Sequence, residues 1–551
     1  MRNLVSKQQV TLSGHSGPVS CIAMSVDHSL IASGETSGPG QPADVIVWDF
    51  AKKALKFRLS SIHQSNVVAL AFSPSGSWLA SVGEEEQLVI WDMLTGSALV
   101  GTSLGGSVNG LSFSSGNTLI TAGRFHLKQW EFVDGRLTSE PVILGSLKRE
   151  FTCVSGTDKV YCGTRSGDFV ELSGPRLSRA GPTFPGGVTC LVVIPKGDLL
   201  LGTGGGVVIK IAAGSFRVLA QSIALDGPVT SLSLTADTSC LFVGTGRGKI
   251  YWMKTEGLQA ELRSACHTSK INQLVFPPGS SSIVGSCAFG SVRLWSTCSG
   301  AELLQIELPN VDCFSLAFTR DGKYILSGWS DGKIRAFTPQ TGKLAFVVND
   351  AHKDGVTALC GLGDASRIIT GGVGGEIRIW LILCRESQEL ESNLKEHRGR
   401  VTAIRIREDD LRAVSSSLDG SIVVWDISNR VRLACLFGEA KIHSLTYSSD
   451  YTQIVSVGTD RRLCYFDVFA AGSPIRIMDG SVSGELNLVV RSEETLVTAG
   501  SDARVRVWDY DRAELVAECV GHTCSVTAGA ASGAILVTGD IHGGIYFWNL
   551  H

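Results

Sequence analysis

A serine, a histidine and an aspartate lie close together in this sequence, and these residue types can perform nucleophilic catalysis. His397, Ser415 and Asp419 are followed by Trp425. In a hydrolase, such a histidine would take the proton of the serine hydroxyl as that hydroxyl attacks a carbonyl. Parts of this set return at regular intervals, whereas a catalytic triad would occur once. We therefore interpret it as structural: Asp caps a tight turn, His bridges Asp to Ser, and Ser accepts the indole N–H.

The recurring unit ends in Trp-Asp and repeats about every 40–45 residues, which is the period of the WD40 repeat. In that repeat, each unit folds into one four-stranded blade of a β-propeller. The blade ends are intact at Trp48, Trp91, Trp425 and Trp508, and altered at Trp130, Trp295, Phe337, Trp380, Phe466 and Trp548.

Short apolar runs separated by Gly, Asp and Ser make up each unit, as in antiparallel β-structure. Three more third strands, at 167–171, 206–210 and 248–252, are identified by spacing alone and bring the units to thirteen. Rings of this type most often have seven blades. The sequence therefore predicts an all-β chain of two tandem WD40 β-propellers. Residues 1–257 form the first, with six visible blades, and residues 258–551 the second, with seven.

Both ends of the chain leave a blade incomplete. The last unit has three strands, so we predict that 258–265 pairs with 545–550 and latches the second ring. Residues 9–12 lie where a fourth strand would end a preceding blade. We therefore expect the first ring to lack its N-terminal blade and to expose a wedge of apolar surface. A true six-bladed ring is the alternative.

Composition and motifs argue against several classes of function. The net charge of −3 is not that of a nucleic-acid binder. Fifteen cysteines without a C-x-x-C pair indicate buried thiols in a reducing compartment. The sequence shows neither a signal peptide nor an apolar stretch of 18 residues, so we expect no membrane partner. The glycine-rich stretches 202–206 and 244–250 resemble hairpin turns more than phosphate loops. We expect no catalytic residue, cofactor, metal ion or small-molecule substrate.

One long insertion, at residues 35–44, is either a disordered tip or a loop that contacts a partner. Its position on a rigid scaffold leaves both interpretations open.

The chain also resembles one particular family, cilia- and flagella-associated protein 52, also called WD repeat-containing protein 16. The stretches that carry the resemblance are 323–339, 349–358, 458–462 and 480–484, and the long loop before 43–49 has a counterpart there. The resemblance implies two fused seven-bladed propellers in the cytoplasm and in the axoneme of cilia and flagella. It also implies contacts with tubulin in the doublet lumen and with other microtubule inner proteins.

The expected function is a non-enzymatic scaffold that binds and stabilises axonemal doublet microtubules through several contacts at once. One alternative is a WD40 adaptor of a cytosolic complex, in actin turnover or in ubiquitin ligation. A second alternative is a propeller enzyme, which would need acids or histidines converging on one central channel.

Overall fold

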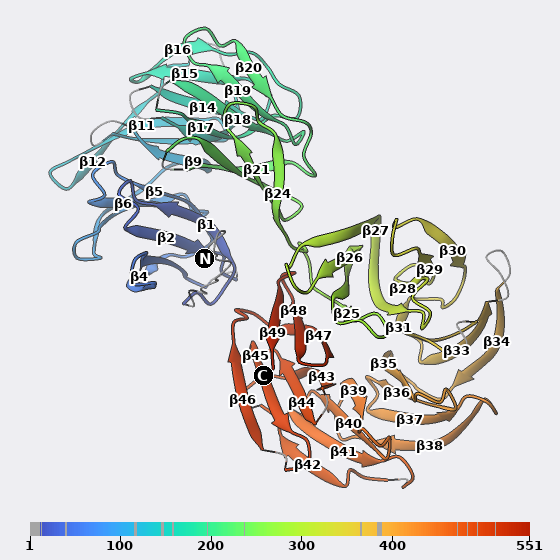
Figure 1. The fold of residues 1–551 in the computed structure, drawn as a ribbon. Helices are drawn as coiled ribbons and strands as arrows, with labels where there is room; N and C mark the ends of the chain where they lie inside the picture. Colours follow the sequence, from blue (N-terminus) through green and yellow to red (C-terminus); the bar gives the residue numbers. More distant parts are fainter. Residues whose placement is uncertain are drawn as a thin grey trace. The chain divides into compact units, whose positions relative to one another are not determined.

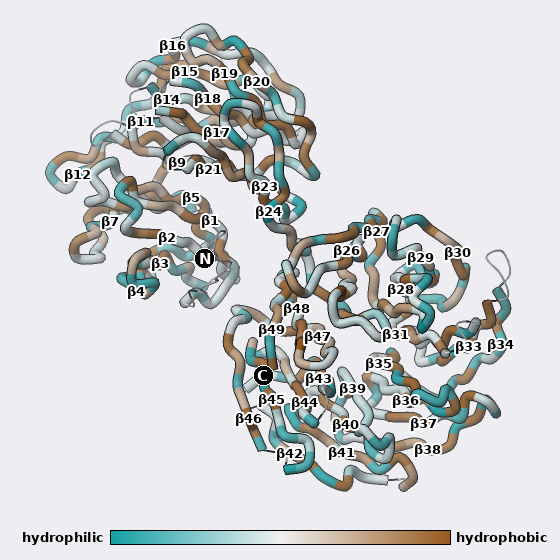
Figure 2. The backbone as a smooth tube through the Cα atoms, in the orientation of Figure 1, coloured by the Kyte–Doolittle hydropathy of each residue, from teal (hydrophilic) through white to brown (hydrophobic). Residues whose placement is uncertain are grey.

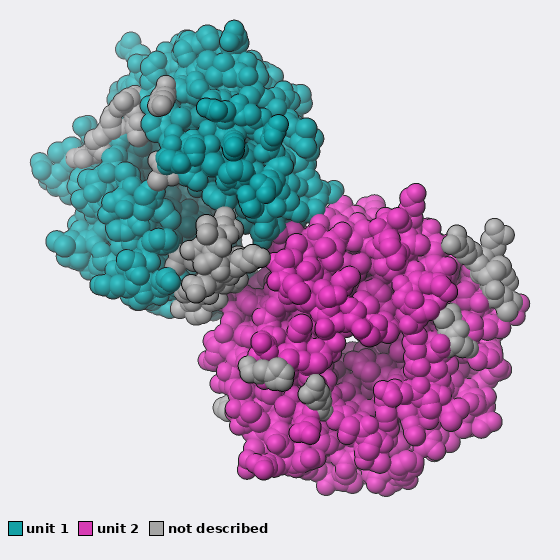
Figure 3. Space-filling model, in the orientation of Figure 1, with its two compact units in different colours: residues 1–264 teal, residues 265–551 magenta. Residues whose placement is uncertain are grey.

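The chain folds into two compact units, Met1–Ser264 (unit 1) and Ala265–His551 (unit 2) (Figure 3). They are seen in a computed structural model. It describes residues 12, 14–38, 41–114, 118–144, 148–156, 159–195, 197–235, 237–363, 366–382, 388–470, 472–481, 483–492, 494–512 and 514–550. All regular structure in these residues is β-strand (Figure 1).

Unit 1 consists of six four-stranded antiparallel sheets, each built from four consecutive strands. The strands are β1 Val19–Met24, β2 Leu30–Glu35, β3 Ala43–Asp49, β4 Ala54–His63, β5 Val67–Phe72, β6 Trp78–Gly83, β7 Gln87–Asp92, β8 Ala98–Ser103, β9 Val108–Phe113, β10 Thr118–Gly123, β11 His126–Val133, β12 Arg136–Pro141, β13 Phe151–Ser155, β14 Val160–Thr164, β15 Phe169–Ser173, β16 Arg176–Ala180, β17 Val188–Val193, β18 Asp198–Thr203, β19 Val208–Ala212, β20 Val218–Gln221, β21 Val229–Leu234, β22 Cys240–Thr245, β23 Lys249–Lys254 and β24 Ala260–Ala265.

Unit 2 has the same blade order and contains seven blades. The strands are β25 Gln273–Val275, β26 Ile283–Ser296, β27 Glu302–Phe318, β28 Ile325–Trp329, β29 Ile334–Phe337, β30 Leu344–Val348, β31 Val356–Gly361, β32 Arg367–Gly372, β33 Glu376–Ile382, β34 Gln388–Lys395, β35 Val401–Ile406, β36 Arg412–Ser417, β37 Ser421–Asp426, β38 Val431–Phe437, β39 Ile442–Tyr447, β40 Gln453–Gly458, β41 Arg462–Asp467, β42 Arg476–Asp479, β43 Leu486–Ser492, β44 Thr495–Gly500, β45 Arg504–Asp509, β46 Leu515–Val520, β47 Val526–Ser532, β48 Ile535–Asp540 and β49 Ile545–Asn549.

Two long strands join the first two blades of unit 2 into one six-stranded sheet. β26 supplies both the second and the third strand of the first blade, because its first half pairs with β25 and its second half with β27. β27 in turn continues from the fourth strand of that blade into the inner strand of the next, where it pairs with β28. The seven-blade count of the second ring is therefore confirmed.

The third strands identified by spacing alone are also confirmed. β15, β19 and β23 each lie third in a four-stranded sheet. The glycine-rich stretches form the turns before β19 and β23, and Gly206 and Gly248 adopt positive φ there. Such a turn favours glycine because a side chain would strain this backbone conformation.

The cores lie between successive blades. One cluster, for example, joins β32 and β33 to the next sheet through Ile369, Ile379, Ile404 and Val423. Second strands are almost wholly buried, whereas fourth strands such as β46 are mostly exposed. Apolar residues accordingly follow the strands of both units, and hydrophilic residues occupy many of the turns (Figure 2).

The predicted latch of the second ring is wrong. β24 pairs as the fourth strand of the sheet β21–β24, so it completes the sixth blade of unit 1 and does not join β49. In the described residues, the last sheet contains only β47, β48 and β49. The unit boundary consequently falls after Ser264 and not after residue 257. A short turn connects β23 to β24, and closing it costs far less chain entropy than pairing across a whole ring.

Hydrogen bonds between inner strands close the second ring instead. The Thr527 hydroxyl, at the start of β47, donates to the Ile271 carbonyl at 2.6 Å, and the Ile271 N–H donates to the Asp540 carbonyl at 3.0 Å. The same kind of hydrogen bond joins other neighbouring blades. For example, the Thr357 hydroxyl donates to the Val401 carbonyl at 2.6 Å. The last blade thus contacts the first through the channel wall.

In unit 1, the first and last sheets each expose apolar side chains among the described residues. Ile22 in β1 is 69% exposed, although it occupies the register position of Ile404, which is 3% exposed. At the other end, Ile250 is 45% exposed, and the Thr230 hydroxyl has no partner among the described residues. Both end sheets thus expose apolar side chains among the described residues, and the missing N-terminal blade remains a prediction. The stretch at residues 9–12 lies outside the described residues except for Leu12, which packs on Trp48 and its neighbours.

Matched substitutions test this open face. Ile22 and Ile404 pair with Ser33 and Ser415, the two serines that bind the blade tryptophans. We expect Ile22→Ala to change the free energy of unfolding by less than about 0.5 kcal/mol, as at exposed sites. Ile404→Ala should cost about 2–5 kcal/mol, because it leaves a cavity. Urea titrations of the full chain measure both. A loss above about 2 kcal/mol for Ile22→Ala would show that this face is covered in solution.

The insertion in the first blade is shorter than expected. Glu35 ends β2, and Ala43 begins β3, so the loop spans 36–42, of which residues 39 and 40 are not described. Glu35 is 2% exposed and accepts hydrogen bonds from the backbone of Ser16 and Asp44. Contact with a partner remains a prediction for the remaining loop.

Candidate functional site

The four residues with a possible catalytic role come together around Trp425. The indole Nε1–H donates to Ser415 Oγ at 2.8 Å, and Ser415 Oγ lies 2.6 Å from His397 Nε2. β36 and β37 hold Ser415 and Trp425 side by side, and His397 comes from the turn before β35. Exposure is 0% for Ser415 and 2% for both His397 and Trp425. No substrate can reach this hydroxyl.

A fifth residue, Ser421, separates His397 from Asp419. His397 Nδ1 lies 2.6 Å from Ser421 Oγ, and Ser421 Oγ donates to Asp419 Oδ1 at 2.5 Å. The predicted direct bridge from His to Asp is therefore wrong. Asp419 does cap the turn, because it accepts the N–H groups of Arg398 and Ser421.

A neutral His397 with its proton on Nδ1 satisfies this whole chain of hydrogen bonds. Ser415 then accepts from Trp425 and donates to Nε2, while Nδ1–H donates to Ser421. Burial lowers the pKa of His397, so the neutral form is favoured. The arrangement pairs every buried polar group and leaves no free nucleophile, which is what a structural set requires.

The same indole bond recurs around both units. Its donors and acceptors are Trp48 and Ser33, Trp91 and Ser81, Trp130 and Thr121, Trp295 and Ser286, Trp380 and Thr370, Trp425 and Ser415, Trp508 and Thr498, and Trp548 and Thr538. The predicted positions Phe337 and Phe466 are buried at 4% and 0% but offer no N–H. In the blade of Phe337, Trp329 from β28 donates to Ser327 at 2.7 Å instead.

The sequence analysis did not predict which residues pair with the Nδ1 atom of each histidine. Ser291 is the partner of His267 and Ser421 is the partner of His397, and each serine stands four positions before its blade tryptophan. Glu35 and Glu85 replace the serine for His15 and His63. The fixed offset of the serine from the tryptophan is the signal that could have found it.

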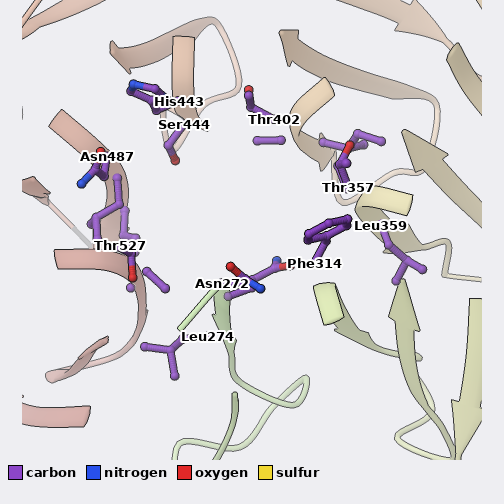
Figure 4. Close-up of a pocket in the computed structure, with 18 of the residues that line it drawn as sticks. Asn272, Leu274, Phe314, Thr357, Leu359, Thr402, His443, Ser444, Asn487 and Thr527 are labelled. Carbon is purple, nitrogen blue, oxygen red and sulfur yellow. The ribbon is translucent and has the colours of Figure 1, made fainter. Parts of the chain in front are cut away.

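The central channel of unit 2 is a second candidate site. Each blade contributes one residue near the start of its inner strand, most of them at a β-bulge. These seven residues are Asn272, Phe314, Thr357, Thr402, His443, Asn487 and Thr527, and they surround an open space (Figure 4). A cavity of about 380 Å³ lies at one mouth, and the hollow is visible in Figure 3.

Most of these channel side chains are already engaged within the ring. Asn272 donates to the Cys313 carbonyl and to Asp312, and Asn487 donates to the Val526 carbonyl at 2.7 Å. His443 Nε2 lies 3.4 Å from a Glu485 carboxylate oxygen. The channel wall therefore holds the blades together, and it brings no set of catalytic acids and histidines into contact in the described residues.

Among the described residues, no group of three or more His, Cys, Asp or Glu side chains could hold a metal ion. The described part of the chain contains no helix long and apolar enough to cross a membrane. Burial raises the pKa of Cys153 to about 11 and that of Cys190 to about 12, so these thiols stay protonated.

The blades, their indole bonds and the two rings define a WD-repeat β-propeller protein. A family model described as WD domain, G-beta repeat matches residues 6–49, 57–92, 307–337, 343–380 and 388–426. These matches include blades of both units.

Longer similarity identifies the family. The chain is 35% identical over 543 residues to cilia- and flagella-associated protein 52 of Homo sapiens, covering 95% of this chain and 87% of the relative. It is 38% identical over 571 residues to the protein of the same name in Chlamydomonas reinhardtii, covering 98% and 91%. The chain belongs to the cilia- and flagella-associated protein 52 family. Membership assigns it to the cilium or flagellum.

Proposed function

We propose that the protein is a non-enzymatic scaffold that binds and stabilises axonemal doublet microtubules as a microtubule inner protein. The observation that carries this proposal is similarity to cilia- and flagella-associated protein 52 over 95–98% of the chain. Tubulin and neighbouring inner proteins are the partners proposed for it.

The architecture supports a binding role. Ser415 and His397, the residues that could have done chemistry, are buried and bonded to each other. What remains accessible is a large set of turns held at fixed spacing by rigid blades. Two such units can contact several subunits of a polymer at once, and multivalent contact raises avidity without a single tight site.

Localisation in a flagellated cell tests the proposal. A tagged chain is expected along the axoneme, and it should stay there after detergent and moderate salt. Purified protein is expected to co-sediment with doublet microtubules and not with actin filaments. A diffuse cytosolic signal with no axonemal signal would contradict the proposal. Co-sedimentation with actin alone would favour the cytosolic adaptor.

A further inference from the structure

Two cations, Lys270 and Arg400, line the mouth of the unit 2 channel. Lys270 stands directly before Ile271 of the first blade, and Arg400 stands directly before β35. Both side chains line the cavity of about 380 Å³. Within the described residues, neither side chain makes a hydrogen bond or an ion pair. Since a guanidinium carries five N–H donors and an ammonium three, this mouth holds unused donors for an anion.

Arg400 is held in place by an aromatic ring. Its guanidinium carbon lies 4.7 Å from the centroid of Phe314, which comes from another blade. Phe314 in turn packs near Gly355, where an added Cβ would lie 3.0 Å from the ring. A contact with an aromatic ring uses none of the five N–H donors, so they stay available to a carboxylate, which matches the guanidinium fork in geometry.

The charges around the mouth do not cancel. Burial lowers the pKa of Lys270, and the charge of Arg400 lowers it further. Burial also lowers the pKa of Arg400 and raises that of Asp312, a carboxylate whose charge acts on both cations. Asp312 is bonded to Asn272 and not to either cation. The remaining titratable group in the lining is His443, which faces Glu485.

We propose that this mouth binds a carboxylate side chain of an acidic peptide segment, with Arg400 and Lys270 as its counter-ions. A peptide fits better than a free anion, because the mouth is open and its rim is polar. Asn487 uses its amide nitrogen on Val526 and Ser525, so its amide oxygen is left to accept a peptide N–H. Binding of a carboxylate at this mouth is proposed from its own residues and does not require the proposed function in the axoneme.

Purified full-length protein and a fluorescein-labelled hexaglutamate peptide test this site by fluorescence anisotropy at low salt. A hexaglutamine peptide is the matched control ligand. Arg400→Gln is expected to weaken binding about tenfold or more, since a hydrogen bond to a charged group contributes about 1.5–3 kcal/mol. Lys270→Gln should weaken binding in the same direction. Asp312→Asn should strengthen it, because the competing negative charge is removed.

Arg512→Gln, an exposed arginine in the turn between β45 and β46, should leave binding unchanged. Within the described residues, the Lys270 side chain makes no hydrogen bond or ion pair, so Lys270→Gln and Asp312→Asn decide the question even if Arg400→Gln unfolds. Equal affinity in the wild type, Lys270→Gln and Asp312→Asn would overturn the proposal. So would equal binding of hexaglutamine, or displacement of the peptide by equimolar inorganic phosphate.

Discussion

Trp425→Ala is expected to lower the free energy of unfolding of unit 2 by about 3–5 kcal/mol. Trp425 is 2% exposed and packs between two blades with Ile379 and Ile404, so its removal leaves a large cavity. The change also removes the indole N–H that donates to Ser415, and leaving this buried hydroxyl without that hydrogen bond adds to the loss. A urea titration followed by circular dichroism measures the change. Hydrogen–deuterium exchange of β37 assigns it to unit 2.

Trp425→Phe separates packing from hydrogen bonding. Phe466 occupies the equivalent position in the next blade and is fully buried, so the fold accommodates a phenyl ring there. We expect Trp425→Phe to cost about 1–3 kcal/mol, mainly for the lost indole bond. A loss below about 1 kcal/mol for Trp425→Ala would refute the structural role, because exposed substitutions usually fall in that range.

The repeat period could predict most of the fold. Blade ends such as Trp48 and Trp508 mark a third strand directly, and period alone located β15, β19 and β23, which have no tryptophan at that position. This works because each blade is a local unit whose four strands follow one another in sequence. Turn residues then locate the hairpins, as Gly206 and Gly248 do.

The strand between the two rings could not be assigned in this way. Both β23 and β49 offered an unpaired edge to residues 258–265, and apolar pattern does not distinguish one edge from another. The structure follows the shorter connection. Leu258 already bonds back to the Lys254 carbonyl, and this turn places β24 beside β23. Chain entropy favours the pairing of β24 with β23, and this effect cannot be read from the pattern of residue types.

The side chains around Trp425 could likewise be predicted only in part. Spacing predicted that Ser415 and Trp425 would meet, since both lie on neighbouring strands of one blade. It did not reveal that Ser421 stands between His397 and Asp419, or that Trp329 substitutes for the indole missing at Phe337. These details depend on side-chain reach within a packed sheet, and several residue types satisfy the same hydrogen bond.

Acid is expected to destabilise both units through their buried histidines. Burial lowers the pKa of His267 to about 3 and those of His126 and His352 to about 4, and the charges of Arg293, Lys128 and Arg378 lower them further. In the unfolded chain, a histidine takes up its proton near pH 6.5. The unfolded state therefore binds more protons between pH 6.5 and the folded pKa. Stability is complete above about pH 6.5 and is lost as pH falls.

The size of this effect follows from the slope of about 1.4 kcal/mol per pH unit for each such histidine. Between pH 6.5 and pH 5, His267 and His352 should each cost about 2 kcal/mol, so together they should lower the free energy of unfolding of unit 2 by about 4 kcal/mol. His397, whose pKa burial also lowers, adds to this loss. Urea titrations at pH 7.5, 6 and 5 measure the loss. His267→Gln should remove about 2 kcal/mol of the loss in unit 2, whereas exposed His542→Gln should leave the loss unchanged. Stability that stays constant from pH 7.5 to 5 would show that these imidazoles take up protons without unfolding. The hydroxyls of Ser286 and Ser291 face His267, and in that case they would rotate to accept hydrogen bonds from its charged ring.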